Sequence, residues 1–151
     1  MITKFEDQLV KPPLPLPPRI DLSVIHEFDY RRVYVTGKFR HDKEMLLGPR
    51  MHDGNDGFFV ITPLERSNGG STILVNRGWI KKEKRHEQDR APAALPQEEV
   101  TVSGLLREPW KRNFFTPVNK PEESKFYFPD VLQMAQVAGA EPVWIEETMS
   151  P

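Results

Sequence analysis

The 151-residue chain contains no cysteine, which excludes disulfide bonds and the thiolate copper or zinc sites of many redox proteins and metal chaperones. It also has no excess of one charge: 21 Lys and Arg stand against 22 Asp and Glu, whereas nucleic-acid binders and polybasic membrane-surface proteins are strongly basic. No apolar run approaches the roughly 20 residues of a membrane span, and the first residues do not resemble a signal peptide. We therefore expect a soluble polypeptide of one domain.

Prolines are abundant near the N-terminus. The densest group is Pro12, Pro13, Pro15, Pro17 and Pro18. Because proline is excluded from helix interiors, this segment is expected to run extended as a stiff strap, which suits either a solvent-exposed spacer or a polyproline ligand for a partner domain. Residues 1–20 are predicted to form a short amphipathic helix, with Ile2, Phe5 and Leu9 on one face, followed by the strap. Residues 21–151 are predicted to form a single β-rich domain.

Two similar segments, residues 31–40 and residues 100–107, alternate apolar and polar side chains with a period of two, as half-buried strands do. Each has a glycine on its predicted inward face, Gly37 in the first and Gly104 in the second. An inward glycine permits sharp bending or the close approach of another backbone, which a small barrel requires. The two glycines therefore favour a closed or strongly curled sheet over a flat one.

Turn residues punctuate the region between these strands. Turns are predicted at Gly48-Pro49, at 53–57 and at 67–71, and the last is expected to join strands 58–61 and 73–75 in a hairpin. The 53–57 segment superficially resembles a calcium loop, but it lacks the required glycine and the terminal glutamate. It is therefore interpreted as a plain turn.

The C-terminal half adds a loop, two strands and a helix. Residues 81–99 show no period and are predicted to be a solvated loop, and residues 126–128 a short strand. A helix is predicted to begin after Asp130 and to end at Gly139, before a last strand at 142–146. Six or seven strands with short connections predict a mainly β (α+β) fold, a curled antiparallel sheet or small β-barrel with one packed helix.

The sequence shows no catalytic constellation. Its four histidines are not at metal-ligand spacing and are interpreted as surface residues: His26, His41, His52 and His86. The serines lack a nucleophile-elbow pattern, and the glycines form neither a P-loop nor a dinucleotide fingerprint. We therefore predict neither enzymatic activity nor a metal site.

Arginine and aromatic residues, which dominate the binding energy of interfaces, suggest recognition instead. The candidates are Arg50, Arg77, Trp79, Trp110, Arg112, Phe114 and Phe115. Arg77 interrupts an apolar strand, and burying an unpaired guanidinium is costly. Either these residues form a binding surface, on which arginine pairs with carboxylates such as haem propionates, or the tryptophans pack in the core and an internal carboxylate holds Arg77.

Several short motifs, in this order and spacing, resemble the surfeit-locus cytochrome c oxidase assembly proteins. They are Tyr30-Arg31-Arg32-Val33, Leu47-Gly48-Pro49-Arg50, Gly57-Phe58, Val75-Asn76-Arg77-Gly78-Trp79 and Phe115-Thr116-Pro117 with Asn119. The residues expected to bind partners are Arg50, Arg77, Gly78, Trp79, Trp110, Arg112 and Phe115, and the structural glycines are Gly37, Gly48 and Gly104. The resemblance implies a soluble domain between two membrane-spanning helices that this chain lacks. That domain would face the mitochondrial intermembrane space from the inner membrane or, in bacteria, the periplasm.

The function that the resemblance implies is that of a non-enzymatic assembly factor, or chaperone, for cytochrome c oxidase. Such a factor stabilises early intermediates of the haem-bearing subunit and aids haem a insertion or subunit association, with oxidase subunits and other assembly factors as partners. The family's haem a handling is ascribed to a histidine segment outside this chain, so haem a is expected only in the full-length protein. Two alternatives are a soluble haem carrier with one of the four histidines as axial ligand, and a small-barrel nucleic-acid module that stacks bases on Tyr34, Phe58 and Phe59.

Overall fold

The computed structural model describes residues 12–17, 20, 31–67, 69–84, 98–107, 125–126 and 131–147. Their elements are β1 (Leu14–Pro15), β2 (Arg32–Phe39), η2 (His41–Lys43), β3 (Met45–His52), β4 (Asn55–Arg66), β5 (Ile73–Lys81), η3 (Lys82–Lys84), β6 (Val100–Leu106), β7 (Lys125–Phe126), α2 (Val131–Ala138) and β8 (Trp144–Glu147). The predicted N-terminal helix lies outside the described residues, as does most of the predicted loop 81–99.

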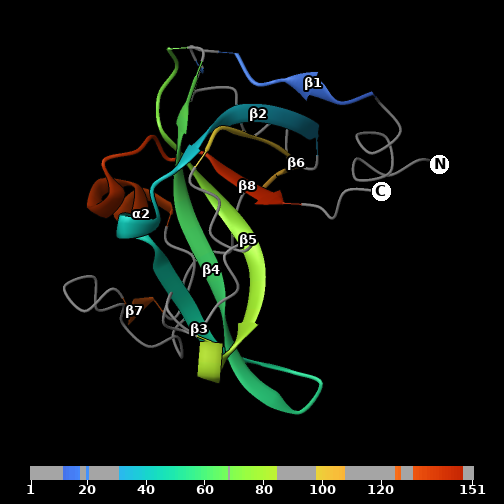
Figure 1. Ribbon diagram of the computed structural model, residues 1–151, viewed down its shortest axis with the longest axis vertical. Coiled ribbons are helices and arrows are strands. Elements are labelled where there is room, and N and C mark those ends of the chain that lie inside the picture. Colours follow the sequence, from blue (N-terminus) through green and yellow to red (C-terminus); the bar gives the residue numbers. More distant parts are fainter. Residues whose placement is uncertain are drawn as a thin grey trace.

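Five strands close into a barrel in the order β2–β6–β8–β5–β4, and β4 pairs back onto β2 at Gly37–Phe39 (Figure 1). The predicted small barrel with a packed helix is therefore confirmed. Most pairings are antiparallel, as expected, but β8 runs parallel to β5, β1 to β2 and β7 to β3. The two-residue strands β1 and β7 bring the number of strands in the sheet to eight, beyond the six or seven predicted.

The two inward glycines lie where the backbones of neighbouring barrel strands approach closely. A methyl group at Gly37 would collide with the carbonyl oxygen of Glu65 on β4, and one at Gly104 would collide with the carbonyl oxygen of Glu146 on β8. Only a residue without a side chain allows the neighbouring backbones to approach this closely. This is the physical reason for glycine at both positions.

β1, in the proline strap, fills a gap in the barrel wall. Pairing between β2 and β4 ends at Gly37, and β1 lies along the uncovered start of β2, beside Val33 and Tyr34. The amide of Leu16 donates to the carbonyl of Tyr34 at 3.2 Å, and the Leu16 side chain, only 5% exposed, belongs to the barrel core. The interpretation of this segment as a solvent-exposed spacer is therefore wrong at Leu16, because its side chain completes the core.

Arg66, at the end of β4, fastens the strap to the β4–β5 connection. Its guanidinium donates to the carbonyls of Pro17 at 2.6 Å and Ser71 at 2.7 Å, and to the Ser71 hydroxyl at 3.0 Å. The residue is 6% exposed, and burial lowers the pKa of its guanidinium, an effect that Glu141 opposes. The buried cation is tolerated because carbonyl oxygens replace its hydration shell.

Two apolar cores lie on opposite faces of β4 and β5. The barrel core is formed by Leu16, Val33, Val35, Phe39, Leu64, Ile73, Val75, Val102, Leu106, Val143 and Ile145. The second core packs under α2 and contains Met45, Leu47, Ile61, Leu74, Phe126, Met134, Ala135, Ala138 and Trp144. The predicted helix is confirmed, and Gly139, with φ of 67°, follows its last residue as expected for a C-terminal stop.

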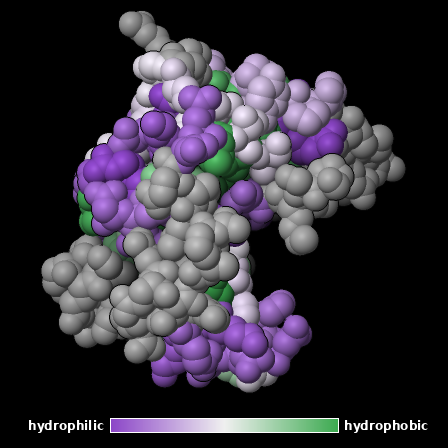
Figure 2. Space-filling view, in the orientation of Figure 1, coloured by the Kyte–Doolittle hydropathy of each residue, from purple (hydrophilic) through white to green (hydrophobic). Residues whose placement is uncertain are grey.

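Beyond the barrel, β4 and β5 continue and form a three-stranded extension with β3, defined here as residues 48–60 and 77–81. Figure 1 shows the extension running away from the barrel to the β3–β4 hairpin, and Figure 2 shows hydrophilic side chains covering that end on the visible face. Asp53 and Gly54 form the turn, with φ of 50° and 78°. Left-handed conformations at both central residues are typical of tight two-residue hairpins and favour an Asp-Gly pair.

Candidate functional site

The Gly48-Pro49 pair forms a β-bulge in β3. Leu47 pairs with Phe59 and Arg50 with Gly57, so β3 contains one residue more than β4 between these pairs. The predicted turn at Gly48-Pro49 is therefore wrong: the strand continues through it to the hairpin. Gly48 has a φ of 151°, and a β-carbon there would lie 3.1 Å from the Phe58 ring, so glycine leaves room for this aromatic side chain.

A second bulge lies on the other side of β4, at Arg77-Gly78 in β5. Asn76 pairs with Ile61 and Trp79 with Phe59, which leaves one extra residue in β5. Gly78 has a φ of 113°, a conformation that side chains disfavour, and its amide donates to the Asn76 side-chain oxygen at 3.0 Å. A bulge bends its strand and shifts the alternation of side chains, so Arg77 and Trp79 fall on different faces of the sheet.

Arg77 lies at the end of the barrel. Its guanidinium stacks 4.5 Å from the ring centre of Phe39, a member of the barrel core. Glu147, on β8, interacts with it electrostatically: partial desolvation raises the pKa of the Glu147 carboxyl, and Arg77 opposes that rise. The arginine within an apolar strand is thus explained by an aromatic face and a nearby carboxylate.

Trp79 lies on the opposite face and connects all three strands of the extension. Its ring lies over Gly57 of β4, where a methyl group would collide with the indole carbons. Its indole N–H donates to the carbonyl of Arg50 on β3 at 3.0 Å, and the His52 ring lies 5.1 Å away at a tilt of 49°. The glycine and the hydrogen bond together fix the position of a half-buried tryptophan.

Cationic side chains flank this indole. Arg50 pairs with Gly57, and Gly57 pairs with Lys81, so the three residues form one row across the sheet with Trp79 over its centre. We call this surface the indole face; it comprises Arg50, His52, Gly57, Trp79 and Lys81. The predicted set included Arg50 and Trp79 but not His52 or Lys81. The sequence could have indicated Lys81, because it follows Trp79 by two residues and residues with this spacing share a strand face.

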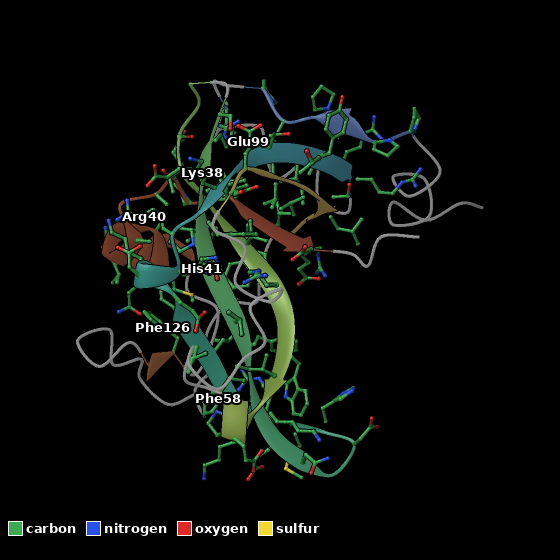
Figure 3. All side chains as sticks on the ribbon, in the orientation of Figure 1. Lys38, Arg40, His41, Phe58, Glu99 and Phe126 are labelled. Carbon is green, nitrogen blue, oxygen red and sulfur yellow. The ribbon has the colours of Figure 1, made fainter. Side chains whose placement is uncertain are left out.

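The other aromatic and arginine residues predicted to bind partners or nucleic acid do not join the indole face in the part of the chain that the structure describes. Trp110, Arg112, Phe114 and Phe115 lie outside the described residues. The predicted platform for stacking nucleic-acid bases does not form, because its three aromatic residues lie apart. Phe59 packs against the second core, under α2, and Phe58 alternates to the other face of β4. Tyr34 lies on the barrel. Figure 3 shows Phe58 on the extension, far along β4 from Lys38 and Arg40 beside the barrel.

The histidines also differ from one another. His52 is exposed on the hairpin end, as predicted, but His41 is buried, with 8% exposure and its ring 5.8 Å from that of Phe39. The interpretation of His41 as a surface residue is therefore wrong. His26 and His86 lie outside the described residues.

The pocket beside β1 does not fit a haem group. A cavity of about 280 Å³ beside β1 is smaller than the roughly 300–1,000 Å³ of typical ligand pockets, and no histidine lines it. Within the same residues, no group of three or more His, Cys, Asp or Glu side chains could hold a metal ion. In the part of the chain that the structure describes, no helix is long and apolar enough to cross a membrane.

Comparison with known proteins shows a match to the SURF1 family over residues 1–151. The chain belongs to the SURF1 family. This membership confirms the resemblance to the surfeit-locus proteins. The chain is 36% identical to the cytochrome oxidase assembly protein SHY1 of Saccharomyces cerevisiae, over 95% of this chain and 38% of that protein.

Two further SURF1 relatives are similar over a comparable stretch. Identity is 30% to a SURF1-like protein of Drosophila melanogaster, over 100% of this chain and 54% of that protein. It is 32% to surfeit locus protein 1 of Homo sapiens, over 97% of this chain and 53% of that protein. The chain thus spans about half of the animal relatives and less of the yeast relative. The two bulges and the indole face lie within this shared SURF1 region.

Proposed function

We propose that this chain is the partner-holding part of a cytochrome oxidase assembly factor, acting by non-covalent binding and without bond chemistry. SURF1 family membership and the name of the yeast relative, a cytochrome oxidase assembly protein, support the assembly role. One structural observation carries the proposal: the two bulged motifs flank a single strand in an extension that projects from the barrel. Partner recognition accounts for an extension with exposed and half-buried side chains better than core packing does.

The indole face suits holding a partner. Tryptophan and arginine are enriched among the residues that contribute most to binding. Trp79 is already held by Gly57 and by the Arg50 carbonyl, so little side-chain entropy is lost when a partner covers it. A preformed surface of this kind favours a binding role for the extension.

The finer aspects of the proposal concern the full-length protein. We propose that it stabilises early intermediates of the haem-bearing oxidase subunit and aids haem a insertion or subunit association, together with other assembly factors. The relatives come from yeast, fly and human, which supports a setting at the mitochondrial inner membrane over a bacterial one. We propose that this region faces the intermembrane space. Haem a binding by the full-length protein stays a prediction, and no histidine lines the pocket beside β1.

The proposal is tested in cells that lack their own copy of the full-length protein. Arg77→Ala and Trp79→Ala are introduced singly and together, and assembled oxidase is measured on native gels. We expect assembled oxidase to decrease at unchanged protein level, in variants that remain folded with a slightly lowered melting temperature, because Arg77 and Trp79 also make contacts within the molecule. Tyr34→Ala, which removes a partly exposed aromatic side chain from the barrel, is the matched control and should leave assembly unchanged. Normal oxidase assembly in stable Arg77 and Trp79 variants would refute the proposal.

A further inference from the structure

We infer that the indole face binds an extended acidic segment of a partner protein, in which two carboxylates about 10 Å apart flank an apolar or aromatic side chain. This inference rests on the proposed holding function and names the chemistry of the segment held. Three observations carry it: the spacing of the cations, the fixed position of the indole and the local charge.

The spacing of the carboxylates follows from the register. Arg50, Gly57 and Lys81 form one row across β3, β4 and β5. Neighbouring strands lie about 4.8 Å apart, so the backbones of the two cationic residues are about 10 Å apart. In a peptide in the polyproline II conformation, side chains three residues apart lie on the same side and are separated by about 9 Å, because this helix has three residues per turn and rises about 3.1 Å per residue. Two acidic residues with this spacing can therefore pair with Arg50 and Lys81 at the same time.

The indole supplies the apolar centre between these cations. Trp79 lies over Gly57, and the Arg50 carbonyl holds its N–H, so its ring cannot turn away without losing that hydrogen bond. An aromatic side chain that stacks on a fixed ring gains contact area at low entropic cost. His52, tilted against the same ring, borders the surface on the hairpin side.

The charge of this region favours an acidic partner. Across residues 48–60 and 78–84, which leave out Arg77 on the opposite face, four Lys and Arg stand against three Asp and Glu, whereas the whole chain carries 21 against 22. The acidic residues of the hairpin do not reverse this, since Asp53 lies against His52 at 3.4 Å and Asp56 pairs with Met51, which alternates to the other face. Complementary charge mainly raises specificity and the association rate.

A nucleic acid or a lipid surface fits the same residues less well. Both recognise rows of cations that follow many phosphates or headgroups, whereas this face carries two cations separated by an aromatic ring. A protein segment needs only two carboxylates and one aromatic side chain to match the two cations and the ring between them. Preferential binding of a nucleic acid or of a lipid surface would therefore contradict the inference.

The experiment uses the 151-residue chain labelled with ¹⁵N, and the indole N–H resonance of Trp79 is assigned with Trp79→Phe. The probe is a capped peptide containing Glu-Phe-Ser-Glu; the controls replace both glutamates by lysine or the phenylalanine by alanine. We expect the acidic aromatic peptide to shift the Trp79 indole and the amides of Arg50 and Lys81. Lys81→Glu should weaken its binding about fivefold, whereas the matched variant Lys38→Glu, on an exposed barrel position, should not.

Several outcomes would overturn the inference: equal shifts by the lysine peptide, no shifts by any peptide, equal weakening by Lys38→Glu, or preferential binding of a thymidine oligonucleotide or of anionic phosphatidylserine vesicles. Oxidase assembly in cells separates this result from the proposed function. If no peptide binds but Trp79→Ala still lowers assembled oxidase, the holding function stands, and the inference that the held segment is acidic is wrong. If peptides bind but assembly is normal in Arg77 and Trp79 variants, the proposed function fails while the binding chemistry stands.

Discussion

The barrel and the extension share strands β4 and β5 but differ in how these strands are buried. In the barrel, both faces of the strands are covered, and Leu64, Ile73 and Val75 are fully buried. In the extension, Phe58 and Ile80 are half-buried and Met51 is 68% exposed. The change occurs at the two bulges. One continuous pair of strands is therefore part of the core in one region and carries the surface that we propose for recognition in the other.

This difference predicts different local stability. The barrel is held by apolar burial on both sheet faces, whereas the extension depends on its ladder hydrogen bonds and on the contacts of Trp79. Segments with few buried contacts open at lower free energy than the core. We therefore expect amide hydrogens of the extension to exchange through local opening, and those of the barrel only through global unfolding.

Glycine substitutions test this comparison with the largest expected effect. Gly37→Ala drives a methyl group into the Glu65 carbonyl and should lower the free energy of unfolding by about 3 kcal/mol or more. Gly78→Ala meets no neighbouring atom but strains a left-handed backbone, and it should cost about 1–2 kcal/mol. Urea unfolding measures both. Equal losses would contradict the division into two regions.

Isoleucine truncation gives the next largest difference. Ile145→Ala empties a fully buried position of the barrel core and should cost about 2–5 kcal/mol. Ile80→Ala, the matched change on the extension, should cost about 1 kcal/mol because its side chain is only half-buried. Thermal and urea unfolding of both variants provide the measurement. A loss at Ile80 as large as that at Ile145 would show that the extension is part of the core.

Trp79→Phe tests whether the tryptophan stabilises the extension alone or also the barrel. The variant keeps an aromatic ring over Gly57 but loses the hydrogen bond to the Arg50 carbonyl, which should cost about 0.5–1.5 kcal/mol. Hydrogen exchange should accelerate for amides of the extension and remain unchanged in the barrel. Faster exchange of barrel amides such as Val35 would instead indicate that the tryptophan stabilises the whole molecule.

The smallest effect concerns the surface charges of the barrel. Hydrogen bonds from Arg40 hold the pKa of Asp42 below its ordinary value of 3.8. A lowered folded-state pKa stabilises the fold above that ordinary value, and the contribution is lost as the pH falls through the folded-state pKa. The stability difference between the wild type and Asp42→Asn should therefore shrink in acid. Urea midpoints against pH test this, with Asp56→Asn on the extension as the charge-matched control.

Local patterns predicted the parts of the fold that depend on nearby residues. The alternation in 31–40 and 100–107 identified two barrel strands, and the helix ends were visible at Asp130 and Gly139. The docking of β1 was missed because it depends on a parallel pairing with β2, which a proline-rich segment does not reveal by itself. Gly48-Pro49 was interpreted as a turn because this dipeptide is typical of turns. Only the register against β4 identifies it as a bulge.

The candidate site was predicted as a set of residues but not as an arrangement. The residue types of Arg50, Arg77 and Trp79 pointed to recognition. Their distribution could not be inferred, because an uninterrupted strand would place Arg77 and Trp79 on one face, whereas the bulge separates them. Gly57 contributes to the site by leaving room for the Trp79 ring above it. This position results from the pairing between β4 and β5 and could not be inferred from the sequence.

The alternation of proline and leucine in β1 has a consequence for self-association. Leu16 directs its amide toward β2, so the alternating positions Pro13, Pro15 and Pro17 come at the outer edge of the sheet, where they offer no N–H groups. A strand from another molecule would find few donors with which to extend the ladder there. The strap that completes the barrel core through Leu16 thus also offers few hydrogen-bond donors for edge-to-edge pairing with another molecule.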